Sequence, residues 1–275
     1  MSSAPTPQEL AGGKLLLDEP APGVVRLTIS NPAKRNALDH PILDAVTSTL
    51  RRLAGEPDVA RCVLLTGSHG MFSAGYDIGE IPDDEFEERA ERLVARPFTQ
   101  AIEALERFPM PTLAALGGHA IGGGLELALS CDLRVAAAGV KLGMPPAKLG
   151  LVYSHTGLRR FIDAIGAPRT RELFLLGRNI EAEVALEWGL VNRVCPEPEL
   201  PETALELAGE LAANAPLSQL GNKRVIAELL RAGARLDPEV EEELIELRLA
   251  SFSSEDMREG VRAFAERRPP RWQGR

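Results

Sequence analysis

The sequence predicts an α/β fold with an all-helical C-terminal part. Short apolar runs of strand length alternate with segments of helical periodicity over the first two thirds of the 275-residue chain. From Ser154 onward the pattern is mostly helical, and few helix breakers interrupt it between about Thr203 and Glu266. This order of elements is typical of an alternating α/β core followed by a helical region.

Composition limits the classes of partner and cofactor. The net charge of -9 argues against nucleic acid or an anionic membrane surface as a partner. Cys62, Cys131 and Cys195 lie far apart in apolar surroundings, and neither a CxxC pair nor a metal-ligand spacing of histidines occurs, so we expect free thiols and no metal site. No apolar run has membrane-spanning length and the N-terminus lacks the features of a signal peptide, which predicts a cytoplasmic protein.

In the first part of the chain, local patterns predict two strands and two helices. Residues 24–29 (VVRLTI) have the composition of a strand, and 62–66 form an apolar run bounded by Gly67, as a buried strand does. A helix is expected over 41–53, with Pro41 suited to its first turn. An acidic, helix-favouring stretch covers 84–108, and Pro111 ends it.

The remaining elements of the core follow from similar runs. Residues 125–129 (LELAL) favour a helix, and strands are predicted at 112–116, 133–137, 141–144 and 191–194. We therefore divide the chain into a flexible N-terminus (1–13), an α/β core (14–202) and a C-terminal helical region (203–275).

Two glycine-centred turns could bind an oxyanion. Gly75 lies in the segment 72–78 (FSAGYDI), shortly after a predicted strand, where glycine allows a sharp turn that directs the next amide into a cavity. Gly122, Gly123 and Gly124 precede strong helix formers and so place N–H groups at the positive end of a helix. Taken alone, each turn is weak evidence, because a glycine triplet more often reflects loop flexibility or tight packing. Neither has a dinucleotide or phosphate-loop pattern, so a nucleotide cofactor is not indicated.

Glu126 is an acidic residue in an apolar segment. It falls in the first turn of the predicted helix, among leucines and alanine. A carboxylate in such surroundings is costly unless it is paired or used in chemistry. A helix-start carboxylate stabilised by the helix dipole is the alternative that the residues leave open.

Four segments together resemble the signature blocks of a known family. These are 31–38 (NPAKRNAL), 72–78 (FSAGYDI), 111–115 (PTLAA) and 122–132 (GGGLELALSCD). In this order and spacing they are similar to the blocks of the crotonase (enoyl-CoA hydratase/isomerase) superfamily, and the resemblance extends from about residue 14 to the C-terminus.

The resemblance implies a fold and a site. The fold is the ClpP/crotonase-like spiral of repeated ββα units, with a C-terminal helical region that assembles trimers, often paired into hexamers. Coenzyme A enters as part of an acyl-CoA substrate, and no cofactor is bound permanently. The backbone N–H groups of Tyr76 and Gly123 correspond to the oxyanion hole, and Glu126 to an acid/base glutamate. The residues that would contact the CoA or the acyl group are Lys34, Arg35, Ala37, Ala74, Gly75, Asp77, Ile78 and Gly122.

Departures from the family pattern narrow the expected reaction. Pro146 stands where hydratases carry a second glutamate, and proline cannot activate water or transfer a proton. This change and the segment 152–157 (VYSHTG) resemble the bacterial methylmalonyl-CoA decarboxylase branch. In that branch a tyrosine matching Tyr153 contacts the substrate carboxylate and a basic residue matching Arg267 helps to bind CoA. A histidine of that branch is replaced here by Tyr76, which keeps the backbone donor and changes the side chain.

Three functions are compatible with these residues. The first is decarboxylation of a small malonyl-type CoA such as methylmalonyl-CoA. The second is enoyl-CoA isomerisation or hydration with a single glutamate. The third, from a different class, is an inactive CoA-binding or scaffold subunit, against which the intact Gly123, Glu126 and Tyr153 argue.

Overall fold

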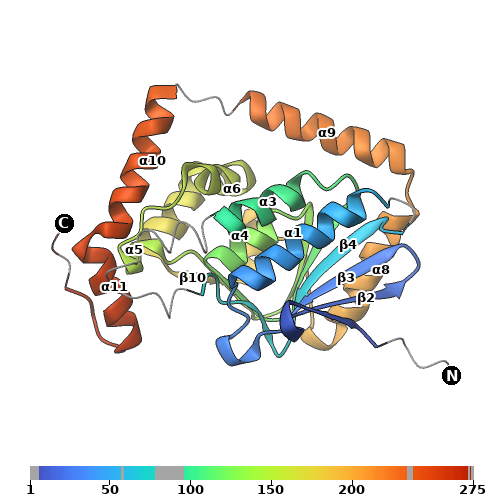
Figure 1. Cartoon of the computed structure of the whole chain (residues 1–275), viewed down its shortest axis with the longest axis horizontal. Coiled ribbons are helices and arrows are strands. Elements are labelled where there is room, and N and C mark those ends of the chain that lie inside the picture. The colour runs from blue at the N-terminus through green and yellow to red at the C-terminus, as the bar shows by residue number, and fades with distance from the viewer. Residues whose placement is uncertain (1–5, 57–58, 78–95, 234–237, 272, 274–275) are drawn as a thin grey trace.

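The structure is a computed structural model that describes residues 6–56, 59–77, 96–233, 238–271 and 273. In this part of the chain the strands form two sheets (Figure 1). The larger has seven strands in the order β1-β2-β3-β4-β6-β8-β11, and the smaller has four in the order β10-β9-β7-β5. The strands are β1 (Gln8–Leu10), β2 (Leu15–Ala21), β3 (Val24–Ile29), β4 (Cys62–Gly67), β5 (Met71–Ser73), β6 (Thr112–Leu116), β7 (His119–Ile121), β8 (Leu133–Ala137), β9 (Lys141–Gly143), β10 (Asn179–Glu181) and β11 (Arg193–Cys195).

The helices follow the strand pairs and then continue alone toward the C-terminus. They are α1 (His40–Ala54), α3 (Arg96–Glu106), α4 (Gly123–Leu129), α5 (Pro146–Leu149), α6 (His155–Leu176), α7 (Ala182–Trp188), α8 (Leu200–Ala213), α9 (Pro216–Ala232), α10 (Pro238–Ser253) and α11 (Glu255–Ala265). Short 3-10 helices occur at Ala11–Gly13, Pro32–Lys34 and Glu197–Glu199. Within the described residues, no helix is both long enough and apolar enough to span a membrane.

Repetition of a ββα unit builds both sheets at once. In the pairs β4–β5, β6–β7 and β8–β9, the first strand joins the large sheet and the second joins the small one. Neighbouring units pair in parallel, β4 with β6 and β6 with β8 in one sheet, and β5 with β7 and β7 with β9 in the other. The spiral of ββα units that the family resemblance implied is therefore confirmed.

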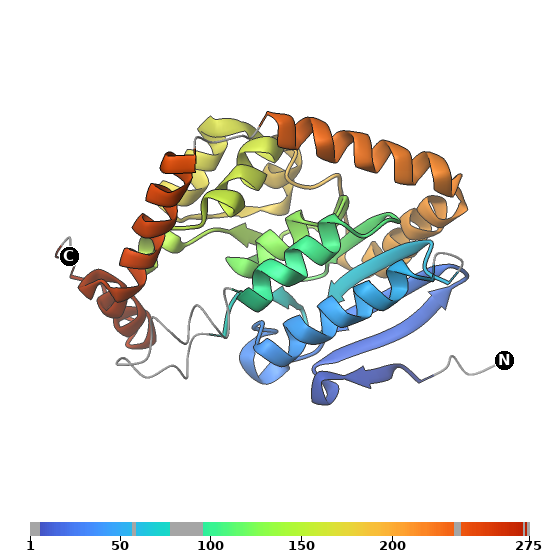
Figure 2. The ribbon, with the colours of Figure 1, turned by 45° about the horizontal axis from the view of Figure 1, so that its top comes forward.

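The core lies on both faces of the large sheet. Helices α1 and α3 pack side by side in front of this sheet, and α8 packs behind β4, β6 and β8 (Figure 2). Because β6 is covered on both faces, all of its five residues are buried, which explains its continuous apolar run. Helix α1 begins where the Asp39 carboxylate accepts a hydrogen bond from the Ile42 amide at 3.0 Å, with Pro41 in its first turn.

The predicted elements agree with the structure where burial is strongest. The strands expected at 24–29, 112–116 and 133–137 are β3, β6 and β8, and the helix expected at 41–53 is α1. The last predicted strand is displaced: β11 covers Arg193–Cys195. The first part of the acidic stretch at 84–108, residues 84–95, lies outside the described residues, and α3 forms in the remainder.

Several strands were not predicted from the sequence. β5, β7 and β10 have three residues each, too few for a periodic pattern, and β2 contains the polar pair Asp18-Glu19 and Pro20. The segment 1–13, expected to be flexible, contains β1, whose residues pair in antiparallel register with β2. This edge strand is held by its backbone pairing with β2. Its polar side chains show no alternating apolar pattern, so the sequence gives no signal for it.

The last three helices lie along the outside of the core. Figure 1 shows α9 crossing above the core and α10 descending at its side to α11, which packs against α5. One side chain fixes α9 at its middle: Lys223 Nζ donates to the Met110 carbonyl at 3.1 Å and to Asp132 Oδ2 at 2.7 Å. The division of the chain at residue 203 stays a prediction.

Candidate active site

The N-terminus of α4 is shaped by glycine. Gly122 has φ 57° and ψ -127°, a conformation that residues with a Cβ rarely adopt, and its amide donates to the Gly143 carbonyl at 2.8 Å. The chain then enters the helix at Gly123. As the first helical residue, Gly123 has no intrahelical acceptor for its N–H, which lies at the positive end of the helix.

The turn after β5 approaches this helix end closely. Gly75 has φ 95°, and a Cβ at this position would lie 2.9 Å from the Ile121 carbonyl oxygen and 3.2 Å from the Gly123 nitrogen. Next to it, a Cβ on Gly124 would lie 2.6 Å from the Ser73 carbonyl oxygen. The two glycine segments predicted from the sequence are therefore in direct contact, and glycine is required on both sides.

Tyr76 follows this contact, and its backbone direction is set by a bridge to Leu38. The Leu38 amide donates to the Gly75 carbonyl at 2.7 Å, and the Asp77 amide donates to the Leu38 carbonyl at 3.1 Å. Because successive backbone groups of an extended segment point to opposite sides, the Tyr76 amide points away from Leu38. The Tyr76 ring covers Gly123, where an added Cβ would lie 2.6 Å from Cε1, and packs edge-on against Phe98 with ring centroids 4.7 Å apart.

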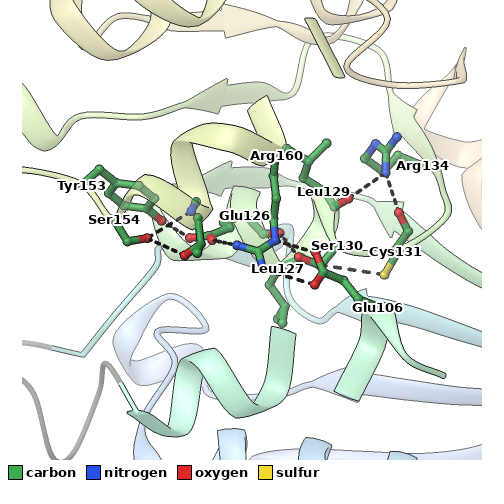
Figure 3. Close-up of polar contacts among 12 residues, drawn as sticks. Glu106, Glu126, Leu127, Leu129, Ser130, Cys131, Arg134, Tyr153, Ser154 and Arg160 are labelled. Carbon is green, nitrogen blue, oxygen red and sulfur yellow. Dashed lines mark hydrogen bonds and ion pairs between the residues drawn. The ribbon is translucent and has the colours of Figure 1, made fainter. Parts of the chain in front are cut away.

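Glu126 lies one turn into α4 and is held from both sides of its carboxylate. Its side chain is 3% exposed. The Tyr153 hydroxyl donates to Oε2, and Arg160 Nη1 donates to Oε1 at 3.1 Å (Figure 3). The sequence left open whether Glu126 is paired with other groups or is stabilised by the helix dipole alone. In the structure it is paired with other side chains.

Tyr153 precedes α6 and is fixed by its neighbours. Ser154 caps the helix by accepting from the Gly157 amide at 3.1 Å, and a Cβ on Gly157 would lie 2.6 Å from the Tyr153 ring. The ring also packs edge-on against Phe174. Burial raises the pKa of the Tyr153 hydroxyl well above its usual value, and the charge of Glu126 and the neighbouring Tyr76 raise it further. The hydroxyl is thus a hydrogen-bond donor at neutral pH.

Arg160 and Glu106 were not predicted from the sequence. Arg160 lies on α6 and Glu106 at the end of α3, and two of the arginine's nitrogens donate to the Glu106 carboxylate at 2.6 and 3.2 Å. Figure 3 shows the guanidinium between the carboxylates of Glu106 and Glu126. The only signal in the sequence is an arginine two helical turns after Tyr153, which is too common a feature to identify a site residue.

The segments expected to line the CoA path also meet. Lys34 Nζ lies 2.8 Å from Asp77 Oδ2, and the Ala74 amide donates to the Arg35 carbonyl at 3.1 Å. Ala37 is buried beside them. Ile78 lies outside the described residues.

Two further positions from the sequence analysis do not contribute a group to this cluster: Arg267 lies outside it, and Pro146 has no side chain that could transfer a proton. Arg267 is exposed and follows the end of α11 at Ala265. Pro146 is buried in the first turn of α5. In the described part of the chain, no group of three or more His, Cys, Asp or Glu side chains could hold a metal ion.

A wide hollow adjoins the cluster on the side of α9. It has a volume of about 1280 Å³ and is lined by Tyr153, Arg160 and Glu106 together with residues of α6 and α9. The site is therefore open to a space large enough for part of a ligand or another chain.

Comparison with known proteins identifies relatives of this chain. A family model for enoyl-CoA hydratase/isomerase matches residues 19–275. The 2,3-dehydroadipyl-CoA hydratase of Escherichia coli (strain K12) is 33% identical over 252 residues, 92% of this chain and 96% of the relative. The carnitinyl-CoA dehydratase of Salmonella typhi is 33% identical over 262 residues, 92% and 95% of the two chains.

Among solved structures, a methylmalonyl-CoA decarboxylase in complex with 2-nitronate-propionyl-CoA is similar, with a TM-score of 0.86 and 28% identity. The match covers 95% of this chain and 99% of that one. Both the whole-chain fold and the sequence relatives thus agree with the resemblance carried by the glycine turns. The chain belongs to the enoyl-CoA hydratase/isomerase (crotonase) family, whose enzymes act on CoA thioesters.

Proposed function

We propose that the protein decarboxylates a small malonyl-type CoA thioester, with methylmalonyl-CoA as the first candidate. The observation that carries this proposal is the asymmetry of the site: Glu126 is paired with Tyr153, whereas the position of a second glutamate is the buried Pro146. The similar methylmalonyl-CoA decarboxylase structure supports it.

In the proposed mechanism, the thioester oxygen accepts hydrogen bonds from the amides of Tyr76 and Gly123. The carboxylate stands perpendicular to the thioester plane, so that the breaking C–C bond overlaps the carbonyl. As CO2 leaves, the bonding electron pair moves onto the thioester oxygen, where the two amides and the helix end stabilise the enolate. A proton from water then adds to the α-carbon as the electron pair returns from the oxygen and the thioester carbonyl reforms, which completes the acyl-CoA product. No base has to remove a proton before the C–C bond breaks.

Tyr153 orients the substrate in this proposal. Its hydroxyl, which donates to Glu126 in the structure, turns to donate to the substrate carboxylate when the thioester is bound. Two carboxylates share the single guanidinium of Arg160, so this cluster carries a net charge of about -1 with both glutamates ionised. That negative charge raises the free energy of the bound substrate, whose carboxylate is also negative, but it does not affect the neutral CO2 that leaves.

We further propose that the CoA part follows Lys34, Arg35, Ala37, Ala74, Gly75, Asp77, Ile78 and Gly122, with Arg267 contributing from the C-terminal part.

Self-association into trimers or hexamers is proposed from exposed apolar side chains of α9. Leu217 and Leu229 are 82% and 69% exposed. Apolar surface of this extent on one helix is typical of a subunit interface.

Hydration or isomerisation with Glu126 as the single acid/base is the second candidate. The relatives named hydratase and dehydratase favour it, because each is 33% identical to the chain. It differs chemically in requiring that Glu126 give and take protons.

A panel of thioesters distinguishes the candidates. We expect CO2 release from at least one malonyl-type thioester and slow hydration of crotonyl-CoA. Tyr153→Phe should reduce CO2 release more than it weakens thioester binding. Brisk hydration without CO2 release from any malonyl thioester would refute the decarboxylase proposal, and binding without turnover of any thioester would favour an inactive CoA-binding subunit.

A further inference from the structure

We propose that Arg160 is a positioning residue that holds the Glu126 carboxylate as the acceptor of the Tyr153 hydroxyl, and that Glu106 moderates the charge Arg160 presents to it. The proposal rests on the proposed function only in taking Glu126 and Tyr153 as the reacting pair. Its geometric basis is a chain of side chains that runs from α3 through α6 to α4 (Figure 3).

The two oxygens of Glu126 have different donors. Oε1 receives a charged donor, Arg160 Nη1 at 3.1 Å, and Oε2 receives the neutral Tyr153 hydroxyl. Two donors on opposite oxygens fix both the position and the rotation of the carboxylate plane. Loss of the charged donor would remove the ion pair that holds Oε1 in place.

A buried carboxylate also needs a compensating charge. Glu126 is 3% exposed, and ionisation in such a place is unfavourable unless a cation is close. Arg160 is that cation, with 19% of its side chain exposed. Burial works against the guanidinium charge, but the hydrogen bonds with Glu106 and the charges of Glu106 and Glu126 outweigh it and raise the pKa of Arg160.

The other charged groups around α4 point elsewhere. From β8, Arg134 donates to the carbonyls of Leu129 and Cys131 at the opposite end of the helix. From β7, His119 is exposed and its ring accepts from the Lys141 amide at 3.0 Å. Besides Arg160, Tyr76 faces the reacting pair among the described residues, and it contributes to the raised pKa of Tyr153.

Glu106 competes with Glu126 for the same guanidinium. Arg160 offers Nε and Nη2 to Glu106 and Nη1 to Glu126, a three-donor division that only a planar fork can make. Because both carboxylates draw on one positive charge, removing Glu106 should increase the effect of Arg160 on Glu126. Removing Arg160 should have the opposite effect.

The composition of the chain supplies a direct probe. It contains two tyrosines, Tyr76 and Tyr153, and both lie in the site. Protein labelled with ¹³C at tyrosine Cζ should therefore give two resonances, which Tyr76→Phe assigns. The Tyr153 resonance should shift when Glu126 takes up a proton, and Glu126→Gln should abolish this acid inflection.

The test compares the midpoint of that inflection in two variants. Arg160→Gln should move it to higher pH by roughly one unit or more, the usual effect of losing an opposite charge at hydrogen-bonding distance. Glu106→Gln should move it to lower pH. Shifts of the same sign, or no shift in either variant, would overturn the proposal, because general loosening of the site cannot produce opposite signs.

A conservative variant and an activity measurement complete the experiment. Arg160→Lys keeps the charge without the fork. If the glutamine variant does not fold, the test rests on Arg160→Lys and on the expected shift to lower pH in Glu106→Gln. The midpoint of Arg160→Lys should stay within about half a unit of the wild type, given the distance dependence of such charge effects; a shift of a full unit or more would overturn the charge assignment. The titration requires no turnover, so it remains decisive for Arg160 even if no malonyl thioester releases CO2, the result that would refute the proposed function alone.

Discussion

Replacement of Gly75 by alanine tests the contact that brings the two glycine segments together. The new Cβ would lie 2.9 Å from the Ile121 carbonyl oxygen and 3.2 Å from the Gly123 nitrogen, both backbone atoms that cannot rotate away. The alanine must also adopt φ 95°. The positive φ costs about 1–2 kcal/mol, and forcing an extra carbon into a packed contact typically costs about 1–3 kcal/mol more.

The matched control is Gly139→Ala. Gly139 has φ 74°, but no atom lies within 4 Å of the position of an added Cβ, so this variant isolates the cost of the backbone conformation. Urea denaturation of both variants should give a loss of unfolding free energy of about 1–2 kcal/mol for Gly139→Ala and about 2–5 kcal/mol for Gly75→Ala. The excess measures the clash.

Activity separates the two variants further. Relief of the clash must move the 75–76 turn away from Gly123, and the loss of one aligned oxyanion donor typically costs about 10²–10³-fold in turnover. Gly139→Ala lies in the turn between β8 and β9 and should retain its activity. Equal stability losses in the two variants, with wild-type turnover in Gly75→Ala, would show that this close approach does not position the amides of the proposed oxyanion hole.

Three other predictions concern the second acid, the C-terminal segment and assembly. Pro146→Glu should raise crotonyl-CoA hydration, measured by loss of enoyl absorbance, and an unchanged rate would argue against a missing second acid. Hydrogen bonds from Arg268 and from the Arg271 amide lower the pKa of Glu259 from 4.5 to about 2, so its stabilisation is complete above pH 4.5 and is lost as the pH falls toward 2. Glu259→Gln should therefore lower Tm at pH 6, and its difference from the wild type should close between pH 4.5 and 2; a difference independent of pH would contradict this. Light scattering should report a trimer or hexamer at micromolar concentration and smaller species for Leu229→Glu, whereas a monomeric wild type would remove the assembly proposal.

The fold was predictable where burial imposes a pattern. β4 and β6 are apolar over nearly their whole length because helices cover both faces of the large sheet, so their existence could be derived from composition alone. β5, β7 and β9 were harder, since strands of three residues depend on their neighbours more than on their own side chains. Of these three strands, only β9 was predicted from the sequence.

The site was predictable where it depends on the backbone. The glycines at positions 75, 122 and 123 indicate unusual turns from the sequence alone, and the folded chain brings these turns into contact. The partners of the site's side chains were harder to predict from the sequence. Arg160 reaches Glu126 across 34 residues and Glu106 across 54, and these contacts depend on how α6 packs against α4 near the end of α3.

The contact between Tyr153 and Glu126 links the two candidate reactions to a single group. A hydratase needs a carboxylate that is free to exchange protons with water, but here one oxygen of Glu126 accepts from Tyr153 and the other from Arg160. Both donors stabilise the ionised form, which can accept a proton and cannot supply one. A reaction that begins with bond breaking and ends with proton return makes smaller demands on this group than one that must activate water and protonate carbon in concert. Weakening the Arg160 contact should therefore affect hydration and decarboxylation differently. It would favour the protonated form of Glu126, which hydration needs, and it would remove the fixed acceptor that holds the Tyr153 hydroxyl before the decarboxylation substrate binds.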